Sequence, residues 1–245
     1  MIEFISMDIG RDREVVFDLR EKNYLNLWDE GGPSEYDLHD LIIFLRCFKD
    51  RFLHFSSRFS IYRDRDVYCK IGFSTGLSYD FGLTNGNLFY EMLTDSEGKC
   101  LFYYDAGDEY PKLMASELSD ILLKQSCLVF DEGDSNIENT KEFREFLEKT
   151  LPRIGFVDSS VINGFGQVVK KVGDKQVCMP ISNMGSGYQR CIRILWMIYN
   201  ALEEPGLFII PCFTSQLHPL TARALYMVLE ETGSKLISTF QCNIK

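Results

Sequence analysis

The chain has few of the features that mark secreted, membrane-spanning or zinc-binding proteins. Its eight cysteines form no C-x-x-C pair and lie in otherwise apolar strings, which is typical of buried reduced thiols rather than of zinc ligands or disulfides. No apolar stretch reaches the roughly 18 residues of a membrane helix, and residues 1–8 lack the basic flank of a signal peptide. These absences predict a protein of a reducing cytoplasm without a membrane contact.

Positive charge is also scarce, with 26 Lys and Arg against 36 Asp and Glu and a net charge of −10. Because non-specific binding to nucleic acids needs clustered basic residues that neutralise phosphates, this balance argues against direct nucleic-acid binding. The hydrophobic fraction of 45% is ordinary for a protein that buries a core. Since no repeat or composition break divides the chain, we expect a single domain over residues 1–245.

The apolar pattern predicts an α/β protein that begins with an antiparallel lobe. Residues 1–28 alternate short apolar runs with charged turns, and residues 67–104 form β-like runs with glycine-bearing turns. Between them, apolar residues at three- and four-residue spacings predict a helix over 37–52. Further helices are predicted over 113–125 and 140–150, with a polar, mobile loop over 131–139.

The C-terminal third alternates helices and strands. A glycine-rich turn at 183–190 leads into a helix that stops before Pro205, and a buried-strand run follows at 207–210. Another helix is predicted over 220–231 and a last strand over 235–240. This order of elements predicts an α/β core.

Residues 27–36 join the last run of the lobe to the first helix through a glycine turn. In a phosphate-binding loop of this design, backbone N–H groups cradle the phosphates, a lysine neutralises them and a hydroxyl holds Mg²⁺. Here Glu35 has the lysine position and Tyr36 has the Ser/Thr position. The positions that we assign to this degenerate nucleotide site are Asp29, Gly31, Gly32, Glu35 and Tyr36.

The run from Met184 to Pro219 resembles the ABC-type ATPase heads of the RecF, SMC and OLD-like group, including short stand-alone AAA-type proteins related to them. Its matching pieces are a Gly-Ser-Gly turn like the ABC signature, a spacer helix ending in Leu-Glu-Glu-Pro-Gly, an aliphatic strand and Leu-His-Pro. The order of elements extends the resemblance over nearly the whole chain. It implies an α/β, ABC-ATPase-like (P-loop NTPase-type) head with an N-terminal antiparallel β lobe and an α/β core.

The residues that this family uses for catalysis are replaced at the matching positions. The family's strand ends in Asp-Glu-Pro, whereas this chain has Pro211, Cys212 and Phe213, and neither proline nor cysteine replaces a carboxylate. The position of the switch histidine holds Gln241, which cannot carry charge. The resemblance therefore implies a pseudo-ATPase with no catalytic residues and no cofactor.

The acids around the glycine turn have more than one interpretation. Carboxylates at a helix N-terminus offset the positive end of the helix dipole, each by about 0.3–1 kcal/mol, so the chain would supply its own anion where a phosphate would sit. In a divergent nuclease or toxin subunit, Asp29, Glu35 and Asp37 would instead hold a metal ion. A sensor would bind a nucleotide or another small ligand in the relic pocket. We favour the first, because no second ligating cluster is visible, and predict no metal site.

The turn Gly185, Ser186, Gly187 and Tyr188 is open to two interpretations. In ABC heads the signature turn of one subunit caps the γ-phosphate bound by the other, so the resemblance implies a partner-binding role for these four residues. Alternatively, glycine and serine simply open a helix. Both stay open, because the signature serine position holds Gly185 and the following Glu or Gln position holds Tyr188.

A thiol nucleophile at Cys212 with His218 as its base is a further enzymatic interpretation. Six residues apart at a strand end, they fit a core cysteine and a turn histidine better. We therefore expect a catalytically inactive subunit that scaffolds or regulates by associating with itself or with an active ABC-type ATPase. The resemblance implies bacterial DNA maintenance or anti-phage defence as the setting.

Overall fold

A computed structural model describes most of the chain, and its residues fall into two compact units. The described residues are 1–8, 14–27, 33–34, 36–43, 45, 66–105, 129–131, 137–156, 161–162 and 167–238. The first unit comprises Met1–Val129 and Lys235–Ile237, and the second comprises Phe130–Ser234 and Ser238–Lys245. The expectation of a single domain stays a prediction.

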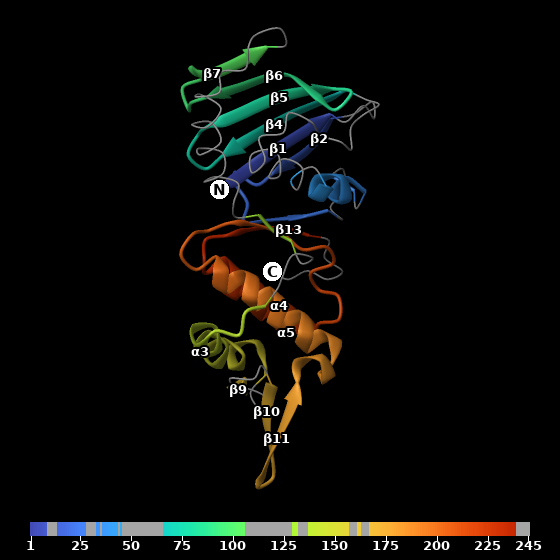
Figure 1. Cartoon of the computed structure of the whole chain (residues 1–245), viewed down its shortest axis with the longest axis vertical. Helices are drawn as coiled ribbons and strands as arrows, with labels where there is room; N and C mark the ends of the chain where they lie inside the picture. The colour runs from blue at the N-terminus through green and yellow to red at the C-terminus, as the bar shows by residue number, and fades with distance from the viewer. Residues whose placement is uncertain are drawn as a thin grey trace. The chain divides into compact units, whose positions relative to one another are not determined.

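A six-stranded antiparallel sheet forms the body of the first unit (Figure 1). Its spatial order is β2 (Glu14–Asp18), β1 (Ile2–Asp8), β4 (Val67–Phe73), β5 (Ser78–Thr84), β6 (Asn87–Thr94) and β7 (Cys100–Asp105). The turn between β5 and β6 consists of Asn85 and Gly86, both with positive φ, which matches the twist of a tight hairpin. The sheet confirms the antiparallel lobe that the sequence predicts.

The sheet buries one face and exposes much of the other. Along β4, Val67, Cys69 and Ile71 are buried while Tyr68 and Lys70 are exposed. This alternation places successive side chains on opposite faces, as a pleated strand requires. The buried face also carries the fully buried side chains of Phe17, Tyr79, Phe81 and Glu91, and the Tyr79 hydroxyl donates a hydrogen bond to the Glu91 carboxylate.

A strand from the end of the chain completes the first unit. Strand β13 (Lys235–Ser238) pairs with β3 (Tyr24–Asn26), and the Leu236 N–H donates to the Asn23 carbonyl at 3.0 Å. Lys235 is only 7% exposed; its ammonium donates to the Leu19 carbonyl and lies 2.7 Å from the Glu3 carboxylate. These partners compensate the desolvation of a buried charge.

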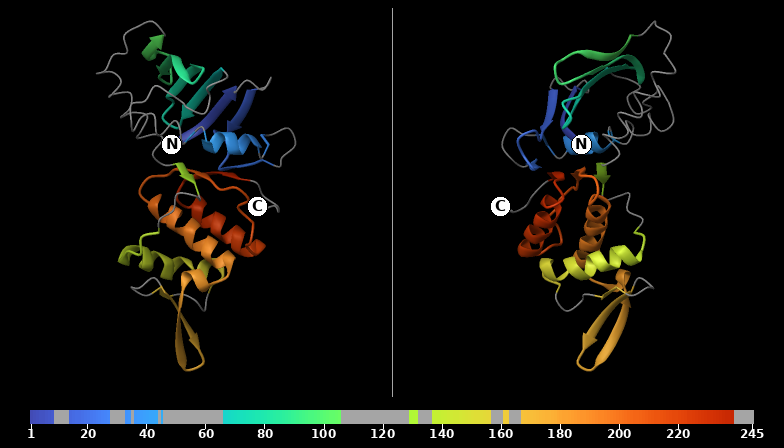
Figure 2. Two further views of the ribbon diagram at one scale, coloured as in Figure 1. Left: turned by 45° about the vertical axis from the view of Figure 1, so that its right-hand side comes forward. Right: turned by 90° about the vertical axis from the view of Figure 1, so that its left-hand side faces the viewer.

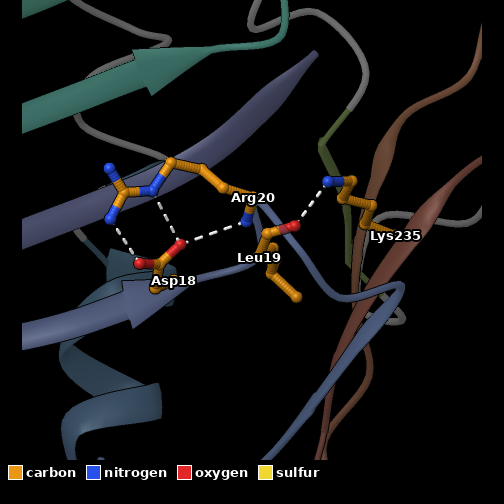
Figure 3. A network of polar contacts seen from close by, with 4 residues as sticks. All are labelled: Asp18, Leu19, Arg20 and Lys235. Atoms are coloured by element: carbon orange, nitrogen blue, oxygen red, sulfur yellow. Dashed lines mark hydrogen bonds and ion pairs between the residues drawn. The ribbon is translucent and has the colours of Figure 1, made fainter.

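Beside Leu19, Arg20 folds back on its own strand end (Figure 3). Its Nε donates to Asp18 Oδ1 at 2.9 Å, and its guanidinium lies 4.6 Å from the centre of the Phe4 ring. The hydrogen bond from Arg20 is the largest cause that lowers the pKa of the Asp18 carboxyl. The contact therefore fixes the bend that follows β2.

The second unit is built around the helix α4. Its elements are β8 (Val129–Asp131), α3 (Lys141–Thr150), a 3₁₀ turn (Pro152–Ile154), β9 (Val161–Ile162), β10 (Gln167–Val172), β11 (Lys175–Pro180), a 3₁₀ turn (Ile181–Asn183), α4 (Ser186–Asn200), β12 (Leu207–Ile209) and α5 (Pro219–Glu230). Helix α4 packs on both α3 and α5. At the first of these contacts, Phe143 meets Trp196 edge-on at 4.7 Å and Tyr199 at 5.3 Å. No helix in the described part of the chain is long and apolar enough to cross a membrane.

Most predicted elements of this unit are confirmed. Helix α3 begins at Thr140, whose hydroxyl accepts the Phe143 N–H at 3.1 Å, and α5 begins with Pro219 in its first turn. Two expectations need correction. Asp131 ends strand β8 rather than beginning a loop, and α4 starts at Ser186, inside the predicted turn. The predicted helix over 113–125 lies outside the described residues, as do residues 132–136 of the loop.

The hairpin of β10 and β11 was not predicted from the sequence. Its antiparallel register runs from Gln167 opposite Pro180 to Val172 opposite Lys175, and Gly173 in its turn has a φ of 61°. Both views of Figure 2 show it extending away from α3, α4 and α5. Because five of the six β11 residues are exposed, the alternation that reveals a half-buried strand is missing.

Candidate functional site

The helix at residues 36–43 and 45 begins where the degenerate nucleotide site was predicted. Ser34 Oγ accepts the Asp37 N–H at 3.3 Å, while Asp37 Oδ2 accepts the Ser34 N–H at 2.6 Å and the Ser34 hydroxyl at 2.7 Å. The Leu38 N–H donates to the Ser34 carbonyl at 3.1 Å, which closes the first helical turn. This reciprocal arrangement is a capping box, with Ser34 as the N-cap and an aspartate in place of the usual Glu or Gln.

The capping box places a carboxylate at the end of the helix that would receive a phosphate. The N–H groups at a helix N-terminus, together with the positive end of its dipole, form a ready anion-binding site. Here the carboxylate of Asp37, which is 2% exposed, takes the N–H and the hydroxyl of Ser34. A phosphate in the same place would compete with that carboxylate for donors and add negative charge beside it. Asp37 thus has the dipole-offsetting position that we expected for the acids of this turn.

Only part of the predicted nucleotide site can be placed. Tyr36 is 81% exposed at the start of the helix, where its ring has no core-packing role. Asp29, Gly31, Gly32 and Glu35 lie outside the described residues, and so does Gln241. The described part of the chain contains no group of three or more His, Cys, Asp or Glu side chains that could hold a metal ion. The metal interpretation of Asp29, Glu35 and Asp37 stays untested.

The start of α4 is built differently. Gly185 is its N-cap, supplies no side-chain hydrogen bond, and is exposed together with Ser186. A Cβ atom on Gly187 would lie 2.4 Å from the Gln216 carbonyl oxygen, whereas one on Gly185 would meet nothing within 4 Å. Gly187 is therefore needed for the close approach of α4 to the loop after β12, while Gly185 is sterically free.

Tyr188 is buried, unlike the two residues that begin α4. It is 5% exposed, and its ring packs edge-on against Phe156 at 5.1 Å. Burial raises the pKa of the Tyr188 hydroxyl to about 12. Because α4 already begins at Ser186, the third residue of the helix turns toward the core rather than outward. Of the four residues to which the resemblance gave a partner-binding role, Tyr188 is therefore buried, whereas Gly185 and Ser186 lie exposed on the surface.

The loop after β12 contains Pro211 and Cys212, two positions that we assigned to the degenerate nucleotide site, and it is held by Arg190. This side chain from α4 is 9% exposed; its Nη2 donates to the Pro211 carbonyl at 2.8 Å and its Nη1 to the Ser215 carbonyl at 3.1 Å. The main-chain oxygen of Pro211 thus accepts a hydrogen bond from a side chain of the same protein. Sequence reasoning missed Arg190, although an arginine within an apolar helical run was a usable signal.

A second clamp on this loop comes from Ser238. Its hydroxyl donates to the Ile210 carbonyl at 2.6 Å and accepts the Phe213 N–H at 3.0 Å. Between these contacts Cys212 has a φ of 50°, a left-handed conformation that a non-glycine residue adopts only when its surroundings impose it. Arg190 and Ser238 supply such surroundings.

His218 has a structural role at the next helix. Its Nδ1 accepts the Leu220 N–H at 3.3 Å, so it caps the start of α5. This contact supports its interpretation as a turn histidine over that of a base for Cys212.

No family model and no curated protein sequence matches the chain. Among solved structures, it is similar to an SMC head bound to the C-winged helix domain of ScpA, with a TM-score of 0.52 and 11% identity over 99% of this chain and 90% of that one. An SMC head domain from Thermotoga maritima gives a TM-score of 0.48 and 12% identity over the same shares of both chains. At such identities the likeness concerns the fold alone. The chain is a mixed α/β protein whose fold is similar to that of an SMC head.

Proposed function

We propose that the chain is a catalytically inactive ABC-ATPase-like head that works as a scaffold or regulator by associating with a second copy or with an active ABC-type ATPase. The observation that carries the proposal is the capping box of Ser34 and Asp37. It uses the helix N-terminus of the degenerate nucleotide site for the chain's own carboxylate. Phosphoryl transfer depends on positioned positive charge at this place, and the sequence offers Glu35 instead of lysine.

The loop after β12 supports the same conclusion. Where an active head presents two carboxylates, this chain presents Pro211 and Cys212, and the Pro211 carbonyl is engaged by Arg190. Without a ligand for Mg²⁺ or a base for water there, hydrolysis lacks two of its parts. The change at both places favours a pseudo-ATPase over a weakened enzyme.

Association with another protein is the function that we propose for this catalytically inactive head. An SMC head of similar fold has been crystallised with a protein domain bound, which supports a partner-binding role in this proposal. Here Gly185 and Ser186 lie exposed at the start of α4 and form the surface that we propose for the partner. The setting, bacterial DNA maintenance or anti-phage defence, rests on the sequence resemblance alone.

The test is phosphate release by the purified chain, alone and mixed with candidate ABC-type ATPases. We expect release at the buffer background for the chain alone and an altered rate for a partner that it binds. Turnover by the chain alone that a Gly32→Val substitution abolishes would contradict the pseudo-ATPase part. Binding of a nucleotide without turnover would favour the sensor alternative.

A further inference from the structure

The outward face of the first unit's sheet carries an unusual row of side chains. Adjacent Cα partners run across all six strands in the order Glu14, Asp8, Tyr68, Gly82, Tyr90 and Asp105. Cross-strand partners in an antiparallel sheet share a face. The row therefore places two tyrosines around a glycine, with carboxylates at both ends.

The glycine at the centre of this row leaves room for aromatic rings above its Cα. A Cβ atom on Gly82 would lie 2.5 Å from ring atoms of both Phe89 and Tyr90. The Phe89 ring packs edge-on against Tyr68 at 5.7 Å and against Tyr90 at 5.1 Å. The rings thus form one connected cluster rather than separate surface residues.

The next row adds another ring and more charge. It runs Val16, Ser6, Lys70, Asp80, Met92 and Tyr103, again by adjacent Cα partners. Lys70 lies 3.6 Å from Asp80, and the Tyr103 hydroxyl donates to Asp105 Oδ2 at 3.1 Å. We call Tyr68, Phe89, Tyr90 and Tyr103 the aromatic face. Its two outer tyrosines keep large exposed fractions, 47% for Tyr68 and 55% for Tyr103.

Charge identifies the kind of partner that this face fits. The two rows contain four carboxylates and one ammonium, and that ammonium of Lys70 is already paired with Asp80. Such a surface repels phosphates, which argues against a stacked nucleic-acid strand. A guanidinium, in contrast, stacks on tyrosine faces and pairs with carboxylates at the same time.

We propose that the aromatic face binds a basic, arginine-bearing segment of a partner protein. Arginine side chains lie over Tyr68 and Tyr103, and the carboxylates of Asp8, Glu14 and Asp105 flank them. Exposed aromatic clusters with a polar rim are a recurrent feature of protein interfaces. The proposal stands on the sheet and holds whether or not the head hydrolyses ATP.

The test uses the full chain and a fluorescein-labelled peptide that alternates arginine with serine, read by fluorescence anisotropy. We expect the double variant Tyr68→Ala and Tyr103→Ala to weaken binding by about fivefold or more, since each ring–cation contact at an exposed site contributes about 0.5–1 kcal/mol. The variant Tyr68→Phe with Tyr103→Phe should bind like the wild type, because the rings are kept.

Two matched controls separate this face from the general acidity of the chain. Leu220→Ala removes an apolar side chain from α5 that is more exposed than either tyrosine, and it should leave binding unchanged. Glu14→Gln with Asp105→Asn should weaken peptide binding more than Glu203→Gln with Glu204→Gln, although both pairs remove two exposed acids. The variant Glu14→Gln with Asp105→Asn also tests the proposal if the alanine double variant does not fold.

Equal binding by wild type and both face variants would overturn the proposal. Tighter binding of a glutamate–serine peptide or of an oligothymidine, lost in the alanine double variant, would also overturn it and would assign the face to another class of partner. Phosphate release measured on the same samples decides the pseudo-ATPase proposal separately, because the peptide result does not depend on it.

Discussion

Two helix starts in this molecule deal with their backbone N–H groups in opposite ways. At Ser34 the chain closes the helix end with its own side chains, and the buried Asp37 carboxylate stands at the positive end of the dipole. At Gly185 no side chain caps α4, no acid occupies its first turn, and the residues at the start are exposed. At the first helix start, side chains of the chain itself accept hydrogen bonds from backbone N–H groups. At the second, no side chain caps the first backbone N–H groups. The comparison explains why we assign loss of nucleotide binding to one and partner binding to the other.

The largest effect is expected from a substitution that disrupts packing at the start of α4. Gly187→Ala would place a methyl group 2.4 Å from the Gln216 carbonyl oxygen, so α4 or the loop after β12 must move. We expect a loss of about 2–3 kcal/mol in the free energy of unfolding, measured by chemical denaturation. Gly185→Ser is the matched control; it meets no neighbour and adds a good N-cap, so its stability should equal or exceed that of the wild type. Equal destabilisation by both variants would contradict the assigned contact.

A smaller effect is expected from opening the first start. Asp37→Ala removes the acceptor of the Ser34 N–H and hydroxyl, and we expect it to cost about 1–2 kcal/mol in the same assay. Asp37→Asn keeps an acceptor oxygen and should cost less. A neutral Asp37→Ala variant would show that the capping box does not hold this helix end.

Parts of this picture were readable from the sequence. The β-like runs over 67–104 and the helix over 140–150 were predicted, and the structure has strands β4–β7 and helix α3 there, because each pattern has a local physical cause. The capping box of Ser34 and Asp37 was not recognised in the sequence, because the expectation centred on Glu35, which has the lysine position of a phosphate loop.

The rest depended on contacts between distant residues. The burial of Tyr188 follows from where α4 begins, and one residue's difference in a helix start turns a side chain by about 100°. The clamps of Arg190 and Ser238 on the loop after β12 join residues more than twenty positions apart. Local sequence patterns do not predict hydrogen bonds between residues so far apart in the chain.

A smaller change in stability is expected when the side chains of a phosphate loop are restored at the first helix start. We expect Glu35→Lys with Tyr36→Ser to fold and to change the free energy of unfolding by about 1 kcal/mol or less, since Tyr36 is exposed. Thermal melts followed by circular dichroism would check this. A variant that fails to fold would contradict this expectation and would point to a structural role for Glu35, because Tyr36 is exposed.

The smallest expected effect on stability comes from Ser186→Arg. Ser186 is exposed, so the monomer should stay as stable as the wild type, but an arginine there would bury an unpaired charge in any interface formed by the start of α4. We expect the variant to lose association with a second copy or with an ATPase partner. Size exclusion with light scattering measures this. A variant that assembles normally would mean that Gly185 and Ser186 only begin a helix.

The central claim is that the chain's own carboxylate occupies the place of a phosphate. Isothermal titration of the wild-type chain with ATP and Mg²⁺ tests it most directly. The account predicts no measurable heat of binding at any ATP concentration that saturates an active ABC-type head measured in parallel. Saturable binding of one ATP per chain, abolished by Gly32→Val, would contradict it.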